Sequence, residues 1–408
     1  MKGLLSSLIV CFFLAPSASS AQTPPQADTD KASVVEGNNA FAVDLYGKLR
    51  NQSGNLFFSP ISVSTALAMT YAGARGETAS EMATTLHFTL PPERLHPAVG
   101  ALLSGLNAPH NSYQLRIANA LWAQKGYPVL DSFLKLNKTD YGASLNRVDF
   151  FGAPEAARST INQWVAQKTN DKIHNLIQPG VLRADTRLVL TDAIYFKSDW
   201  QTQFEKYETK DDDFYLNSRR HVTAPMMHRT GKFSYMKGNG FRALEISYKD
   251  FETSMIVFLP GTYDGLPALE SSLTAANLRQ WMGQLQPVPK VILAMPRFTV
   301  TRDFGLQETL GTMGMPDAFD RALANFSGIA GSRKLFLSEV IHKAFINVDE
   351  EGTEAAAATA VFGVLGAIFG GPEEPPIPFT VDHPFIFLIR DNRSGSILFM
   401  GRVTDPTK

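Results

Sequence analysis

The residues best suited to chemistry lie in one stretch, from Glu350 to about Pro378. It begins with acidic residues around a glycine and continues into four alanines. On their own, glutamate and alanine favour an exposed helix. If the strand-like alternation of the preceding residues continues instead, one face of the stretch is small and uncharged. The members of that face are Thr353, Ala355, Ala357 and Thr359, whereas Glu354 points the other way.

A face of this kind would let the stretch be exposed in one state and buried in another. An extended segment with no bulk, buried charge or proline on its inward side can enter a sheet as a central strand. Val340 to Val348, directly before it, alternates apolar and polar residues as a strand does. The sequence therefore leaves two alternatives, an exposed helix or a strand that inserts into a sheet.

The chain beyond Thr359 has the composition of a displayed loop. Val361 to Gly371 alternates apolar residues with glycines, and the next seven residues include four prolines that cannot continue a sheet. A flexible apolar loop before a stiff return suits binding in extended form to a protease cleft. No Lys or Arg lies between Gly352 and Asp382, so trypsin-like proteases are not the expected targets.

Motifs of enzymes and of nucleic-acid binding are missing from the sequence. It contains no Gly-x-Ser-x-Gly elbow, His-Glu-x-x-His pair or phosphate loop, and its eight histidines lack metal-ligand spacing. The formal net charge of -1 gives no bias toward nucleic acid or membranes. We therefore predict a protein that is not an enzyme, uses no cofactor or metal, and does not depend on heparin.

The first residues have the pattern of a secretory signal, Met1 to Ala21. Lys2 supplies the charge, Leu4 to Leu14 the apolar core, and small residues the cleavage site. The only cysteine, Cys11, lies inside this segment, so the mature chain would have no disulfides. The sequence predicts a secreted, extracellular protein, or a periplasmic one in a Gram-negative bacterium.

The remaining chain predicts one α+β domain over 35–408, after a flexible lead-in over 22–34. Helical spacing covers Val35 to Arg50, and a second helix follows Ser59 and Pro60. Strand-like runs gather later in the sequence, which favours large, mainly antiparallel sheets. These runs are Leu188–Phe196, Thr253–Leu259, Val291–Val300, Leu337–Val348 and Pro384–Ile389. We expect the protein to be a monomer.

Four motifs, in this order, resemble the serpin family, and the likeness runs from about Val35 to Pro406. The motifs are Asn55–Ser62, Asp192–Lys197 with Trp200, Glu350–Thr359, and Phe379–Phe387. The resemblance implies a serpin fold with an exposed reactive-centre loop at about 350–378. It also implies a suicide inhibitor, which traps a serine protease covalently as the cleaved loop inserts into the main sheet.

The family's functional residues are carried over onto matching positions. The hinge that starts insertion would comprise Glu350, Glu351, Gly352, Thr353, Glu354, Ala355, Ala356, Ala357, Ala358 and Thr359. The family's usual loop length places the reactive bond between Gly366 and Ala367, with Leu365 or Phe369 as alternatives in a shifted register. These residues suit elastase-, chymotrypsin- or subtilisin-like pockets. The alternative function is a non-inhibitory serpin that acts as a carrier or chaperone-like binding protein.

Two further groups support the hinge in this resemblance. The shutter, beneath the centre of the sheet, would comprise Ser59, Ser62, Asp192 and His342. The breach, where insertion begins, would comprise Trp200, Arg297 and Glu350. Asp192 departs from the family's asparagine, and a buried carboxylate needs a proton or a charged partner. His342 could share a proton with Asp192 or become imidazolium, so we predict that shutter opening depends on pH.

Overall fold

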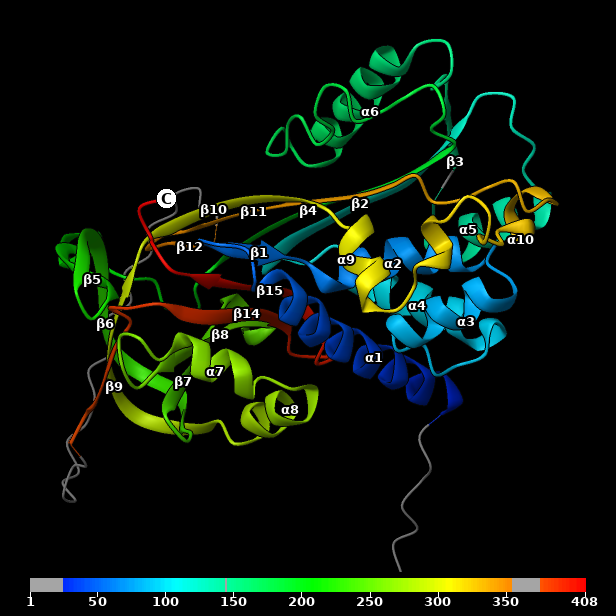
Figure 1. Ribbon diagram of the computed structural model, residues 1–408. Helices are drawn as coiled ribbons and strands as arrows, with labels where there is room; N and C mark the ends of the chain where they lie inside the picture. Colours follow the sequence, from blue (N-terminus) through cyan, green and yellow to red (C-terminus); the bar gives the residue numbers. More distant parts are fainter. Residues whose placement is uncertain (1–24, 144, 354–374) are drawn as a thin grey trace, which may run out of the picture.

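The computed structural model describes residues 25–143, 145–353 and 375–408, which form two sheets flanked by helices (Figure 1). The helices are α1 (Gln26–Leu49), α2 (Pro60–Tyr71), α3 (Gly76–Thr85), α4 (Pro92–Leu106), α5 (Asp131–Tyr141), α6 (Pro154–Lys168), α7 (Leu266–Ser272), α8 (Ala275–Gly283), α9 (Gln307–Met313) and α10 (Ser327–Ala330). Short 3-10 turns are η1 (Lys206–Glu208), η2 (Lys249–Phe251) and η3 (Asp317–Phe319). None of the helices in these ranges has the length and apolar composition needed to cross a bilayer.

The six-stranded sheet has the order β10-β11-β12-β4-β2-β3 and carries the hinge. Its strands are β2 (Tyr113–Gln124), β3 (Leu145–Val148), β4 (Leu188–Asp199), β10 (Phe298–Gly305), β11 (Glu339–Val348) and β12 (Gly352–Thr353). Most pairings are antiparallel, but β11 pairs with β4 in parallel, as does β2 with β3. In Figure 1, α6 lies over one face of this sheet and α2 lies on the other side.

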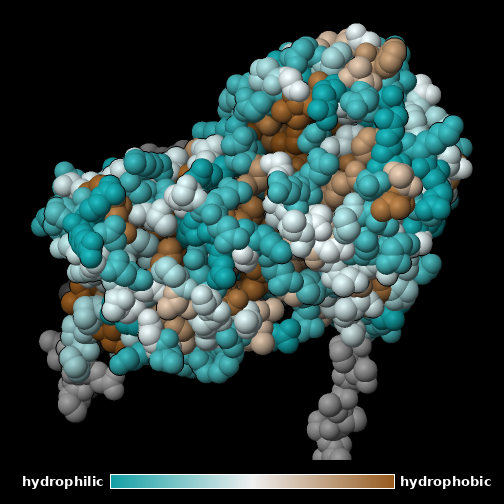
Figure 2. All heavy atoms as spheres, in the orientation of Figure 1, coloured by the Kyte–Doolittle hydropathy of each residue, from teal (hydrophilic) through white to brown (hydrophobic). Residues whose placement is uncertain are grey.

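The nine-stranded sheet has the order β1-β15-β14-β8-β7-β6-β9-β13, with β5 paired to β6. Its strands are β1 (Leu56–Phe58), β5 (Lys210–Asn217), β6 (Arg220–Lys237), β7 (Phe241–Ser247), β8 (Thr253–Pro260), β9 (Gln286–Pro296), β13 (Ile377–Thr380), β14 (Phe385–Asp391) and β15 (Ile397–Val403). Polar residues cover most of the face shown in Figure 2, and the inner faces of both sheets meet α2 in the core.

The predicted flexible lead-in, 22–34, is wrong from Gln26 onward, because α1 begins there. Pro25 precedes the helix with an extended backbone, which suits a helix start. Asp30 then accepts a hydrogen bond from the Arg94 guanidinium of α4 at 3.0 Å, and Val34 is buried. Long-range contacts therefore stabilise a segment whose own composition favours disorder.

The predicted strand runs are present, with one interruption. Val291–Val300 is split at Arg297, so that β9 belongs to the nine-stranded sheet and β10 to the six-stranded one. The backbone N–H of Arg297 leaves the ladder and donates to the Pro225 carbonyl at 2.9 Å. The chain thus crosses between sheets beside the predicted breach.

Candidate functional site

Two residues of the predicted hinge, Gly352 and Thr353, occupy a central position in the six-stranded sheet. Over Glu339–Ala344, β11 pairs directly and in parallel with β4. Further along, β12 lies between these strands, with Thr353 opposite Val348 on β11 and Ser198 on β4. The gap between β11 and β4 is therefore open at one end, where two residues have entered, and closed at the other.

Both residues of β12 fit this position closely. A Cβ on Gly352 would collide with the backbone carbonyl of Ser198, so only glycine allows such an approach. The Thr353 side chain is 1% exposed, and its hydroxyl lies 2.6 Å from the phenol of Tyr248. The Tyr248 ring in turn stacks on Trp200, with centroids 4.4 Å apart. The two residues of β12 thus form a packed, hydrogen-bonded structure.

The three residues predicted for the breach meet at this same end of the sheet. The Glu350 carboxylate accepts a hydrogen bond from Arg297 Nε at 2.7 Å and another from the Thr209 hydroxyl. Burial opposes ionisation of Glu350, but these two hydrogen bonds outweigh it and hold its pKa below the ordinary value. The Glu350 side chain is 2% exposed, whereas Arg297 is 42% exposed. The carboxylate is the buried partner of the pair.

Trp200 connects the breach to the backbone of the hinge. Its indole N–H donates to the Asp349 carbonyl at 2.9 Å, and its backbone N–H donates to the Glu351 carbonyl at 2.8 Å. The backbone N–H of Phe204 donates to the Glu350 carbonyl at 2.9 Å, and Lys206 forms an ion pair with the Glu351 side chain. The segment after β4 therefore holds three consecutive residues of the hinge approach.

Two of the predicted shutter residues organise the start of α2. The Ser59 side chain is the N-cap: it accepts a hydrogen bond from the Ser62 backbone N–H at 3.3 Å. The same hydroxyl donates to the Leu398 carbonyl of β15 at 2.7 Å. This contact links the helix to the nine-stranded sheet on one side, and His342 supplies the link on the other. All four predicted shutter side chains are buried.

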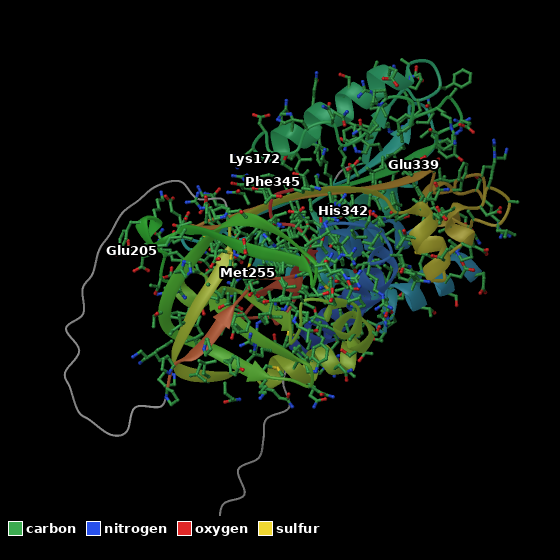
Figure 3. The ribbon with its side chains drawn as sticks, turned by 60° about the vertical axis from the view of Figure 1, so that its left-hand side comes forward. Lys172, Glu205, Met255, Glu339, His342 and Phe345 are labelled. Carbon is green, nitrogen blue, oxygen red and sulfur yellow. The ribbon has the colours of Figure 1, made fainter. Side chains whose placement is uncertain are left out.

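His342 lies on β11 (Figure 3). Its ring contacts Ser59 at the start of α2 on one side and Asp192 of β4 on the other. The Ser59 backbone N–H lies 3.0 Å from Nε2, and Asp192 Oδ1 lies 2.7 Å from Nδ1. Because a backbone N–H can only donate, Nε2 is an acceptor, and the ring is neutral with its proton on Nδ1. Of the two alternatives from the sequence, this geometry fits a shared proton and not an imidazolium. The other Asp192 oxygen, Oδ2, has no hydrogen-bond partner among the described residues.

Sequence reasoning missed several residues of this site. Asn119 of β2 faces Asp192 across the ladder and exchanges hydrogen bonds with Ser62, at 3.1 Å and 2.8 Å. Tyr248, just after β7, and Thr209, just before β5, also come from distant parts of the sequence and carry no local signal. Asp349 does carry one: its carboxylate accepts from the backbone N–H of Glu351, an Asx-type turn that the Asp-Glu-Glu-Gly sequence could have indicated.

Part of the predicted site lies outside the described residues. The predicted reactive bond, Gly366–Ala367, and its alternatives Leu365 and Phe369 belong to this part. So do the hinge residues from Glu354 to Thr359.

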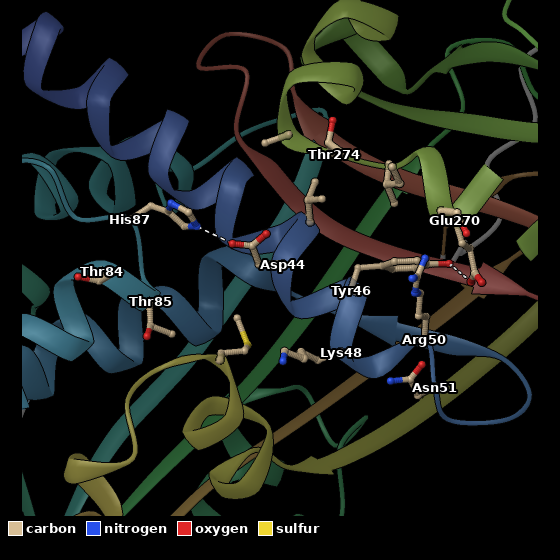
Figure 4. Close-up of a pocket in the computed structure, with 16 residues that line it drawn as sticks. Asp44, Tyr46, Lys48, Arg50, Asn51, Thr84, Thr85, His87, Glu270 and Thr274 are labelled. Carbon is tan, nitrogen blue, oxygen red and sulfur yellow. Dashed lines mark hydrogen bonds and ion pairs between the residues drawn. The ribbon is translucent and has the colours of Figure 1, made fainter. Parts of the chain in front are cut away.

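A separate hollow of about 720 Å³ beside α1 contains none of the predicted site residues (Figure 4). Its charged and polar side chains pair with one another. His87 lies 2.7 Å from Asp44, and the Tyr46 phenol donates to Glu270 at 2.8 Å. Glu270 also accepts from Arg402 at 2.9 Å. These contacts give the hollow a structural explanation as the junction of α1 with α7 and with the turn after α3.

Comparisons with known proteins cover nearly the whole chain. A family model described as "Serpin (serine protease inhibitor)" matches residues 36–406. The chain is 42% identical over 375 residues to leukocyte elastase inhibitor of Xenopus laevis, covering 90% of this chain and 97% of that protein. It is 41% identical over 393 residues to serpin B3 of Homo sapiens, covering 92% and 100%. The solved structure of uncleaved ovalbumin has a TM-score of 0.82 at 28% identity, covering 92% of this chain and 100% of that one.

These relatives contradict one prediction from the sequence. We predicted a secreted, extracellular or periplasmic protein, whereas leukocyte elastase inhibitor and serpin B3 are intracellular. The predicted localisation is therefore wrong. It depended on the composition of Met1 to Ala21 alone. Those residues lie outside the described part of the structure.

Proposed function

Because this chain belongs to the serpin family, we propose that it inhibits an elastase-like serine protease as a suicide substrate. The observation that carries the proposal is β12, in which Gly352 and Thr353 already lie between β11 and β4. A segment seated at the open end of that gap is placed to continue along it once the loop is cut. The hinge residues beyond Thr353 are small, which supports the same path.

The chemical step is acylation of the protease serine, and the protease supplies the catalytic groups. The protease serine Oγ attacks the carbonyl carbon of the reactive bond, an ester forms, and the C–N bond breaks. The serine proton leaves with the new amino terminus of the carboxyl-side fragment. Insertion of the hinge then carries the esterified protease away from the site of attack and distorts it before water can hydrolyse the ester. The protease is the covalent partner, and one copy of the inhibitor is consumed for each enzyme trapped.

The character of the target follows from the loop composition. With no Lys or Arg between Gly352 and Asp382, the loop offers nothing to a pocket that requires a basic side chain. Apolar and small residues suit elastase-like, chymotrypsin-like or subtilisin-like pockets. The relatives named leukocyte elastase inhibitor support the elastase-like choice among these. Within the proposed loop, Gly366–Ala367 is the reactive bond in the register that we favour.

A protease panel tests the proposal. The protein is mixed with elastase-, chymotrypsin-, subtilisin- and trypsin-like enzymes, and the products are analysed by detergent gels after boiling and by mass spectrometry. We expect a stable adduct with the elastase-like enzyme, none with the trypsin-like one, and a released peptide that begins at Ala367. Cleavage of the loop by every enzyme without any adduct would contradict inhibition and would favour the carrier or chaperone-like alternative.

Thr353→Arg tests the insertion step separately. The Thr353 side chain is buried against Tyr248, so a guanidinium at that position should block entry of the hinge. We expect the variant to be cleaved as a substrate with no adduct that survives boiling, whereas Thr353→Ser keeps the hydroxyl and should still form the adduct. If Thr353→Arg forms the adduct as readily as the parent protein, insertion through β12 is wrong.

A further inference from the structure

A second cavity, of about 710 Å³, lies beside the predicted breach and is lined in part by the nine-stranded sheet. It is lined by Gln201 and Thr202 after β4, by residues of β6 and β7, and by the end of β14. A volume of this size is within the range of small-molecule sites, roughly 300 to 1,000 Å³. None of the four predicted shutter residues lines it. The cavity therefore needs an explanation of its own.

The side chains that line the cavity carry more positive than negative charge. Arg390 is neutralised by Glu245, at 2.7 Å. Arg229 and Lys232 have no carboxylate partner among the described residues, although both line the cavity. Burial lowers the pKa of Arg229 to about 10, so the guanidinium still carries its charge at neutral pH. Two cations without counterions thus face one hollow.

Arg229 is held in a fixed orientation. Its guanidinium lies over the ring of Phe233 at 4.5 Å and over that of Phe204 at 5.1 Å. One N–H donates to the Thr202 carbonyl, which leaves most of its five donors without a partner in the described structure. A guanidinium that is positioned in advance and has free donors suits a planar anion such as a carboxylate.

An aromatic side chain forms another part of the lining. Phe251 lines the cavity and is 61% exposed, although most phenylalanines of the protein are buried. Asp250 and Phe251 both have a positive φ, 57° and 58°, a conformation that residues other than glycine adopt at a cost. The backbone thus holds Phe251 at the cavity, where its ring would stack on a flat apolar ligand.

We propose that this cavity binds a small aromatic carboxylate, whose anionic group contacts Arg229 and Lys232 and whose ring lies against Phe251. Serine, threonine and amide side chains complete the wall and supply further hydrogen-bonding groups, while the apolar part of the ligand is covered by the phenylalanine. Phosphate-like ions lack this apolar part, and neutral aromatics lack the charge. The cavity is therefore selective for molecules that combine both features.

Isothermal titration of the full-length protein tests the proposal with 2-naphthoate, the neutral 2-naphthamide and inorganic sulfate. We expect naphthoate to bind about tenfold or more tightly than either comparison compound, because it alone combines a charge-assisted hydrogen bond with a ring that contacts Phe251. Binding of naphthamide as tight as that of naphthoate would overturn the anionic part of the site. Sulfate binding as tight as that of naphthoate would overturn the aromatic part.

Exposed side chains allow the site to be changed without disturbing the core. Lys232→Gln and Phe251→Ser should each weaken naphthoate binding by about tenfold. Lys237→Gln is the matched control: it removes an exposed lysine from the same strand, β6, outside the cavity, and should leave the affinity unchanged. Equal affinities for the parent protein, Lys232→Gln and Phe251→Ser would overturn the proposal. None of these measurements depends on protease inhibition.

Discussion

The Thr353 hydroxyl and the Tyr248 phenol lie 2.6 Å apart, and both side chains are buried. Burial raises the pKa of Tyr248 well above its ordinary value, so the phenol is neutral at any physiological pH. The same ring stacks on Trp200, whose indole N–H binds the backbone just before the hinge. The first inserted side chain is therefore coupled to the residue that anchors the hinge backbone.

A double-mutant cycle measures this coupling. Tyr248→Phe keeps the stacked ring but removes the phenol oxygen, and Thr353→Val removes the hydroxyl at nearly constant volume. Each single change should destabilise β12 by about 1 kcal/mol, because it leaves a buried polar group without its partner. The double variant should cost less than the sum of the two. Hydrogen exchange of the peptide that includes Gly352 and Thr353 provides the readout, and strictly additive effects would contradict direct coupling.

The Arg297–Glu350 pair should control how firmly β12 is held. In Arg297→Met the buried Glu350 carboxylate loses its cation. We expect β12 to open about tenfold more often, a modest effect because Arg297 is partly exposed. Faster hydrogen exchange at Gly352 and Thr353 would reveal it. Arg321→Met, at an exposed turn, is the control and should change nothing.

Acid should weaken the same contact. The pKa of Glu350 is lowered in the folded state, so its stabilising contribution is present above the ordinary value of 4.5 and is lost as the pH falls through the lowered one. We expect hinge exchange in the parent protein to accelerate only in strongly acidic buffer. In Arg297→Met this acceleration should be smaller, and an identical acid response in both proteins would argue against the ion pair as its source.

The Asp192–His342 contact should make sheet opening sensitive to pH. Nε2 of His342 accepts the Ser59 N–H, so adding a proton at Nε2 replaces that hydrogen bond with two donors facing each other. We expect the rate of protease inhibition to change on acidification in the parent protein. Asp192→Asn removes the carboxylate that would stabilise a protonated ring, and the pH profile should change. An unaltered profile in Asp192→Asn would contradict the shutter hypothesis.

His96 should make the folded protein sensitive to mild acid. Burial lowers its pKa to about 4, and its Nδ1 lies 2.6 Å from the Tyr141 phenol. The unfolded chain binds this proton near pH 6.5 and the folded chain only near pH 4, so stability falls between these values, by up to about 3 kcal/mol. Melting temperatures at pH 7.5 and 4.5 should differ less in His96→Asn than in the parent protein. The exposed His221→Asn should retain the parent's difference.

The elements predicted correctly from the sequence are strands that are buried on both faces and therefore consist almost entirely of apolar residues. Leu188–Phe196 lies inside β4, and Pro384–Ile389 coincides with β14 from Phe385 onward. In both strands consecutive β-branched and aromatic residues are covered on both faces. β2 escaped notice, because polar residues such as Arg116 and Asn119 interrupt its apolar pattern. The crossing at Arg297 was also missed, since the run continues locally while the hydrogen-bond partners change.

The candidate site was likewise predicted only in part. Glu350 and Arg297 were paired in advance through the family resemblance, and the structure brings them together. Tyr248 and Asn119 were not found, because each meets its partner only after strands distant in the sequence are paired. The unpaired Oδ2 of Asp192 likewise depends on what the fold places around it, which no local pattern records.

At β12 the sheet changes from direct pairing of β11 with β4 to pairing of both strands with an inserted segment, and this boundary can move along the sheet. Each step of insertion separates one parallel residue pair of β11 and β4. It replaces that pair with two antiparallel pairings, one on each side of the incoming residue, so each step increases the number of paired residues by one. Six such pairs remain, from Glu339 to Ala344, which at roughly 3.3 Å per residue is about 20 Å of travel. The distance that the captured enzyme moves is therefore set by the number of residues inserted. A single bulky side chain in the hinge would stop insertion, and its position in the sequence would decide how far the enzyme has moved.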